Sequence, residues 1–232
     1  MMSKKDVLLG LLKQRFSEIE FEDFERFSLK SIEAVYKVLR YFRDEFGDNI
    51  FRKLNAIKAK EDDTPLALFS PTLGCIKLSL KLFGEKPDQF ELLKWTYPER
   101  IFIHELIHYL LHLAGLSDNE SDEDLNNQPL INLRKFVSKN RVECTSCCPN
   151  LTLKIRIISD IPTLTEEFIC EVVSIYLNNI IRNPDVRVED IFSESKIKYC
   201  IEALRFYEEL KLIIREELYE GNNRDNYSSF CQ

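Results

Sequence analysis

Residues 101–112, Ile-Phe-Ile-His-Glu-Leu-Ile-His-Tyr-Leu-Leu-His, decide most of what this chain can be, because they hold all three of its histidines. Apolar side chains fill most of the other positions, and a helix that is apolar on nearly every side is usually buried. Burying a carboxylate and several imidazoles without partners costs much free energy. A bound metal ion is the simplest compensation, so the stretch predicts a buried helix that holds a metal.

The two ends of this helix can be predicted from the flanking residues. Thr96 with Glu99 three positions later forms the pattern of a capping box, and Pro98 falls in the first turn, where its missing N–H does no harm. Gly115 stands where a helix end favours a left-handed residue. The helix is therefore expected to begin near Pro98 and to end just before Gly115.

His104 and His108 are the candidate metal ligands. They share one helix face, roughly 6 Å apart, so that both imidazoles can reach one ion at roughly 2 Å. Glu105 is rotated from them by roughly 100°, which suits it to hold a water beside the metal rather than to bind the metal. The pattern His-Glu-x-x-His is typical of zinc hydrolases. The alternative is a chance match in which the histidines are ordinary core residues.

His112 is less well placed to bind the same ion. On an unbroken helix it lies roughly 12 Å along the axis from His104 and is turned by roughly 80°. We therefore predict that it lines the site or supports a ligand, with direct metal contact as the alternative.

A later helix is expected to supply the third ligand. Residues 163–177 have helical spacing, with Pro162 and Thr163 at the start and Glu166 completing a second capping box with Thr163. One polar stripe crosses this otherwise apolar helix. It either faces solvent or faces the metal, and it consists of Glu167, Glu171, Ser174 and Asn178.

The two helices together resemble the gluzincin branch of the zincin metallopeptidases. The resemblance rests on His104-Glu-Leu-Ile-His108 followed by Glu167-Phe-Ile-Cys-Glu171. It implies that Glu167 binds zinc and that Glu171 orients a histidine from behind. Because Glu171 stands where Asp is commoner in that branch, the two roles can be exchanged. The first helix is also similar to that of the compact ImmA/IrrE-type peptidases.

A sheet is expected beside the first helix. Within residues 65–83, Ser70-Pro-Thr-Leu-Gly74 predicts a turn, and apolar and polar residues then alternate from Ile76 to Leu82, as in a strand with one buried face. Residues 151–157 alternate in the same way. In proteins that the chain resembles, an edge strand before the metal helix pairs with extended substrate, a general way to hold a peptide.

The seven cysteines allow other interpretations of the metal site and of the chain's chemistry. Gly74-Cys75 before the helix is similar to peptide deformylase, which takes a cysteine as third ligand. However, Leu73, and Leu110 or Leu111, depart from that family's pattern. Cys144, Cys147 and Cys148 have the spacing of half a zinc site or of a redox pair, or are simply partly buried thiols or one local disulfide. Cys170 and Cys200 sit on apolar helix faces and are expected in the core.

Composition sets the outer limits of the function. The net charge is −7, and no basic tract favours nucleic acid. The N-terminal apolar run is too short for a signal peptide, and no segment reaches the roughly 18 apolar residues of a membrane span. A cytoplasmic protein with mostly free thiols is therefore expected, with no nucleic-acid or membrane partner.

The predicted fold is α+β and mainly helical, a zincin-like core with a small mixed or antiparallel sheet packed on the metal helix. We expect a single domain over residues 1–232, with N-terminal helices in 1–60, the catalytic core in 61–182, and a C-terminal helix and tail in 183–232. Ser28 is expected to cap one helix, and another is expected to follow Ser193 and stop near Gly221.

Together, these residues predict a hydrolase of peptide bonds that uses one zinc ion per chain, held by His104, His108 and Glu167. Zinc would polarise the scissile carbonyl and activate a water, and Glu105 would act as general base. The candidate oxyanion donors are Tyr109, Tyr97, Tyr176 and Arg141. The substrate is a peptide or protein, and the sequence favours no oligomeric state. The alternative is a catalytically silent zincin-fold binding protein, whose closed metal site would have four protein ligands.

Overall fold

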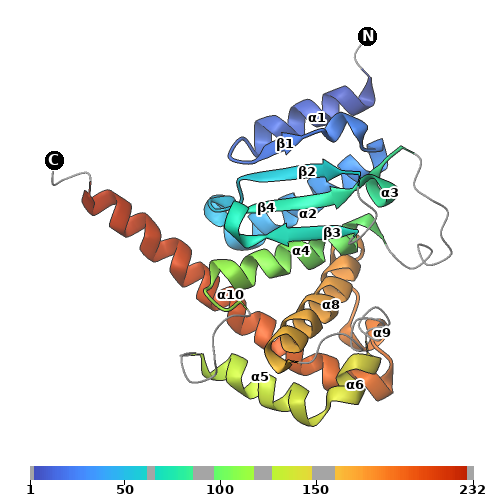
Figure 1. Cartoon of the computed structure of the whole chain (residues 1–232), viewed down its shortest axis with the longest axis vertical. Helices are drawn as coiled ribbons and strands as arrows, with labels where there is room; N and C mark the ends of the chain where they lie inside the picture. The colour runs from blue at the N-terminus through green and yellow to red at the C-terminus, as the bar shows by residue number, and fades with distance from the viewer. Residues whose placement is uncertain (1–2, 62–65, 86–96, 118–126, 148–159, 229–232) are drawn as a thin grey trace. The chain divides into compact units, whose positions relative to one another are not determined.

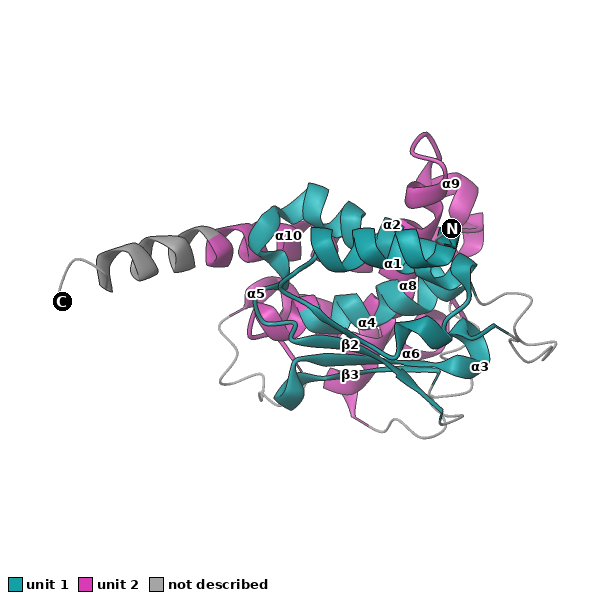
Figure 2. Cartoon of the chain, turned by 90° about the horizontal axis from the view of Figure 1, so that it is seen from above, with its two compact units in different colours: residues 1–109 teal, residues 110–232 magenta. Residues whose placement is uncertain are grey.

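The computed structural model describes residues 3–61, 66–85, 97–117, 127–147 and 160–228 (Figure 1). The chain divides into two compact units, Met1–Tyr109 and Leu110–Gln232 (Figure 2). Helix α4 (Pro98–Leu113) begins in the first unit and ends in the second. The fold is α+β and mainly helical with one small mixed sheet, as predicted; the zincin-like core and the single domain stay predictions.

The first unit is built on a four-stranded sheet with the order β1-β2-β4-β3. Strands β1, β2 and β4 are parallel to one another, and β3 pairs with β4 in the antiparallel sense. The elements that precede α4 in this unit are α1 (Lys4–Arg15), β1 (Glu20–Glu22), η1 (Phe24–Arg26), α2 (Leu29–Phe46), η2 (Asp48–Phe51), β2 (Ala56–Lys60), β3 (Ala67–Ser70), η3 (Pro71–Leu73), β4 (Cys75–Ser79) and α3 (Leu80–Phe83).

The register of the sheet separates an apolar face from a polar one. One row of paired residues crosses all four strands and is buried throughout: Phe21, Ile57, Ile76 and Phe69. The next row holds partly exposed lysines and the exposed Leu68, because successive side chains of a strand point to opposite faces. Figure 2 shows α1, α2 and α4 on one side of the sheet.

Helix α2 follows the predicted pattern closely. Ser28 caps it, since the Ser28 hydroxyl accepts a hydrogen bond from the Ser31 amide. The five residues expected on its inner face are all buried: Ile32, Val35, Leu39, Phe42 and Phe46.

Two expectations about the sheet were wrong in part. The strand that begins at Cys75 ends at Ser79 and not at Leu82, because the Ser79 hydroxyl accepts a hydrogen bond from the Lys81 amide and starts the short helix α3. Residues 1–60, expected to be helices, also contain β1 and β2. The predicted turn at 70–74 is present and joins β3 to β4.

Helix α4 begins at Pro98 and ends where Gly115 was expected to end it. Gly115 has a φ of +69°, and its amide bonds the carbonyl of His112 while the Leu116 amide bonds that of Leu111. This pair of bonds is the glycine-dependent Schellman end of a helix. Thr96, the expected cap at the other end, lies outside the described residues.

The second unit is helical in its described part. Helix α8 packs against α5 and α10, and α10 also contacts α5 and α6. The bounds of these helices are α5 (Gln128–Lys139), α6 (Arg141–Ser146), α8 (Ile161–Arg182), α9 (Val188–Ile191) and α10 (Glu194–Ser228).

Two helix ends in this unit differ from the sequence-based expectation. The cap of α8 is Asp160 and not Thr163, because the Asp160 carboxylate accepts the Thr163 amide at 2.8 Å. Helix α10 continues past Gly221 to Ser228. The strand predicted over 151–157 lies outside the described residues.

Among the described helices, none combines the length and the apolar character that crossing a membrane would need.

Candidate metal centre

His104 and His108 face each other on α4. Their Nε2 atoms are 3.2 Å apart, and their ring centroids are 5.0 Å apart. His104 is buried and His108 is half-buried, in a helix whose apolar neighbours Phe102, Ile103 and Ile107 are fully buried. The one-turn spacing thus brings two basic nitrogen atoms to one point in an apolar setting, as the sequence predicted.

Glu105 reaches the sheet. Its side chain is 8% exposed, and its Oε2 atom accepts a hydrogen bond from the Phe69 amide at 2.6 Å. The contact ties the buried carboxylate to strand β3, at the edge of the sheet.

The strand register directs the Phe69 amide away from β4 and toward Glu105. The Ser79 amide bonds the carbonyl of Leu66, so in this antiparallel pair the backbone groups of the even-numbered residues point toward β4. The backbone groups of Ala67 and Phe69 therefore point away from β4, along the outer edge of β3. Glu105 occupies one of these edge positions.

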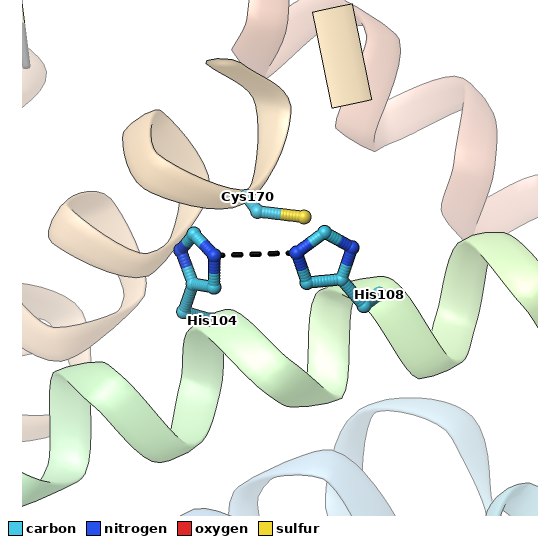
Figure 3. A group of neighbouring side chains, drawn as sticks. All are labelled: His104, His108 and Cys170. Atoms are coloured by element: carbon cyan, nitrogen blue, oxygen red, sulfur yellow. Dashed lines mark hydrogen bonds between the residues drawn. The ribbon is translucent and has the colours of Figure 1, made fainter. Parts of the chain in front are cut away.

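Cys170, on helix α8, completes a group of three potential ligands. The ligand atoms of His104, His108 and Cys170 all lie within 4.8 Å of one another (Figure 3). The sulfur atom lies beside both imidazole rings in Figure 3. These three side chains could hold a metal ion.

The polar stripe of α8 does not face solvent. Glu171, Ser174 and Asn178 are buried, and Glu167 is half-buried. This excludes the explanation that the stripe faces solvent. The group of metal-ligating side chains within the described residues nevertheless contains neither Glu167 nor Glu171. Their assignment as ligand and supporting acid stays a prediction.

Two other candidate residues stand apart from this group. His112 is half-buried and is not one of the three clustered side chains, in agreement with its distance along the helix. Tyr109 is fully buried, and its hydroxyl donates a hydrogen bond to the carbonyl of Ile50 at 2.6 Å. Burial raises the pKa of this phenol above its usual range. The hydroxyl thus has a structural partner, and its proposed role toward an oxyanion stays a prediction.

Sequence reasoning missed two features of the site. Cys170 is buried in the core, as predicted, but its place beside the two histidines was not predicted. It lies three residues after Glu167 and four before Ser174, which is the spacing of one helix face. That spacing was the available signal. The contact between Glu105 and the Phe69 amide had no local signal, because the two residues are 36 positions apart.

The chemistry of the donor set limits which ions fit. Imidazole nitrogen and thiolate sulfur suit zinc, copper and other late transition metals, whereas calcium and magnesium prefer oxygen. Three protein ligands are also the number found in catalytic zinc sites, where a fourth position stays open. The arrangement can therefore support metal-assisted hydrolysis if the third ligand leaves that position open.

Comparison of the chain with protein-family models, with curated proteins and with solved structures found no match.

Proposed function

We propose that this protein is a zinc-dependent peptidase in which Glu105 is the general base. The main support is that the imidazoles of His104 and His108 converge on α4. A buried carboxylate, that of Glu105, directly follows the first of these histidines. A structural metal site has no use for a base at that position. The substrate class, a peptide or protein, follows from the resemblance to gluzincins.

The distance between the two imidazoles fits zinc. Two nitrogen atoms that each lie about 2 Å from a tetrahedral ion are about 3.3 Å apart. The Nε2 atoms of His104 and His108 are 3.2 Å apart. When bound, zinc would polarise the scissile carbonyl and lower the pKa of a bound water to about 7. The third ligand would come from α8, as Glu167 by the resemblance or as Cys170 by its position.

The role of Glu105 is proton transfer. Its Oε2 atom is held by the Phe69 amide, which leaves Oε1 to take a proton from the attacking water and to deliver it to the leaving amine. A hydrogen bond of this kind fixes the position of the carboxylate. A carboxylate held in one position is what a general base requires.

The edge of β3 is the proposed place for the substrate backbone. The outward backbone groups of Ala67 and Phe69 could pair with an extended peptide, as edge strands do in the proteins that the chain resembles. Because the Phe69 amide binds Glu105, the outward backbone groups of Ala67 are the ones that we propose for such pairing. The expected cytoplasmic location is part of the same proposal.

The test is the variant Glu105→Gln. It keeps the shape of the side chain but cannot take up a proton, so we expect normal zinc content and a loss of cleavage of at least about 100-fold. Zinc content is measured by elemental analysis, and cleavage is measured with an unfolded protein such as casein. Glu99→Gln, on the first turn of the same helix, is the matched control and should cleave like the wild type. Full cleavage by Glu105→Gln would remove Glu105 from the mechanism.

The second candidate function is a zincin-fold binding or regulatory protein without catalysis. The position of Cys170 favours it in one specific case: if Cys170 and Glu167 both bind the metal with the two histidines, the site has four protein ligands and is closed. A closed site has no position for a reactive water. The number of α8 ligands therefore separates the two functions.

A further inference from the structure

The second unit contains a group of thiols that is separate from the metal centre. Cys144 lies on α6, Cys147 follows the last residue of that helix, and Cys200 lies on α10. All three are buried and none is in a disulfide. Helices α6 and α10 pack against each other, so the thiols of the two helices are brought together by the fold.

Cys147 lies against the turn of α10 that leads to Cys200. The Cys147 thiol donates a hydrogen bond to the backbone carbonyl of Lys196, with its sulfur 3.8 Å from that oxygen. Lys196 precedes Cys200 by one turn of the helix, so this carbonyl lies at the turn that carries Cys200. The packing of the two helices therefore brings the thiols of Cys147 and Cys200 into one neighbourhood.

The environment lowers the pKa of the Cys147 thiol. The hydrogen bond from Cys200 lowers the pKa of Cys147, and the nearby charge of Lys196 adds to this effect. For Cys144 the direction is opposite, since burial raises its pKa to about 12. The thiolate is the reactive form of cysteine, so an oxidant that reaches this group should react with Cys147.

We propose that Cys147 and Cys200 form a reversible disulfide when the protein meets a peroxide. The Cys147 thiolate attacks one oxygen of hydrogen peroxide, which gives a sulfenic acid and releases hydroxide. The Cys200 sulfur then attacks the sulfenic sulfur, the S–S bond forms, and water leaves with the Cys200 proton. In sum, two thiols and one hydrogen peroxide give one disulfide and two waters. A small dithiol returns both cysteines to the reduced form by exchange.

Burial selects the oxidant and the partner. Cys147 is 5% exposed and Cys200 is fully buried, so a molecule as small as hydrogen peroxide can reach the pair more readily than a bulky disulfide can. Cys144 is the competing partner because it lies only three residues before Cys147 on the same stretch of helix. However, the Cys147 sulfur already lies against α10, one turn before Cys200 on that helix.

The experiment is peroxide treatment of the folded full-length protein, followed by blocking of free thiols and peptide mapping by mass spectrometry without reduction. We expect a cross-link between the peptides of Cys147 and Cys200, with a mass lower by two hydrogens, that a dithiol reverses. The control Cys144→Ser should give the same cross-link. A cross-link between any other pair would overturn the proposal. So would free thiols at both positions after prolonged treatment with excess peroxide.

A second variant guards against loss of folding. Cys200→Ala removes the resolving thiol, so peroxide should leave a sulfenic acid at Cys147 that a sulfenic-acid reagent traps. Circular dichroism shows whether this variant is folded. If it is folded and Cys147 stays unmodified while the wild-type pair also stays reduced, the proposed reactivity of Cys147 is wrong. The outcome is independent of zinc binding and cleavage.

Discussion

Tyr109 allows a test at the scale of one hydroxyl group. The side chain is fully buried between η2 and β3, where its hydroxyl bonds the Ile50 carbonyl and its ring meets Phe69 edge to face. We expect Tyr109→Phe to lower the free energy of unfolding by about 1–3 kcal/mol, because the carbonyl loses its partner in a buried place. Urea denaturation measures this. Tyr36→Phe, which removes an exposed hydroxyl near Arg15, should change it by less than about 0.5 kcal/mol.

The same variant tests the oxyanion role. If the hydroxyl is structural, cleavage by the folded Tyr109→Phe protein should equal that of the wild type. A loss of about 100-fold or more would restore Tyr109 as an oxyanion donor.

The raised pKa of Tyr109 also implies that the folded state keeps its proton more tightly than the unfolded state does. Its contribution is therefore complete below about pH 10 and declines as the pH rises above that value, a decline that the variant should lack.

The turn between β3 and β4 provides a test at the scale of a structural element. Gly74 has a φ of +56°, and a Cβ placed there would lie 2.5 Å from the carbonyl oxygen of Lys53 and 2.9 Å from the side-chain nitrogen of Asn55. Gly115 has a similar φ of +69° but open space around it. Both substitutions by alanine carry the strain of a left-handed residue, about 1–2 kcal/mol. Only Gly74→Ala adds a clash with rigid backbone.

We therefore expect Gly74→Ala to destabilise the protein by about 1–3 kcal/mol more than Gly115→Ala does. The difference between the two variants is the effect of the clash alone, and denaturant unfolding measures it. Equal destabilisation would mean that the backbone of the turn moves away from the new methyl group. The Gly74 carbonyl accepts the amides of Asn55 and Ala56, so such a movement would also disturb the start of β2.

The elements differ in how well the sequence predicts them, and the difference follows from the range of the interactions. The start of α2, the end of α4 and the turn before β4 were predicted because a cap, a glycine or a turn is set by residues a few positions apart. Strand β1 has only three residues and forms by pairing with β2, more than 30 positions later. Its own residues contain no such signal.

The end of β4 illustrates competition between two signals. The alternation of apolar and polar residues continues to Leu82, which favours a longer strand. The structure ends the strand at Ser79, because a serine that caps the next turn satisfies the Lys81 amide locally. Alternation alone therefore extended the predicted strand past a residue that could stop it.

At the scale of the whole molecule, the candidate site depends on residues far apart in the chain. The histidine pair is local and was predicted from its four-residue spacing. Its third neighbour lies 62 positions after His108, and the choice between Glu167 and Cys170 depends on how α8 is turned about its own axis. Helical spacing narrows the choice to one face of α8, but only tertiary packing selects the residue.

Zinc binding should accordingly stabilise the whole chain. A ligand that binds only the folded state adds about 2.7 kcal/mol at a free concentration 100 times its dissociation constant. We expect zinc to raise the melting temperature of metal-free protein and a chelator to reverse this. His108→Ala should abolish the rise, whereas His112→Ala should keep it, because His112 is outside the cluster.

The two α8 variants decide which side chain completes the site and with it which function holds. Because the cysteine and not the glutamate lies with the two histidines, we expect Cys170→Ala to lose most of the zinc-dependent rise and Glu167→Ala to keep it. Cys75→Ala, another buried cysteine removed from a strand, is the control for lost packing. The opposite result would establish the ligand set of the gluzincins. Loss of the rise in both variants would mean four protein ligands, a closed site, and a binding protein in place of a peptidase.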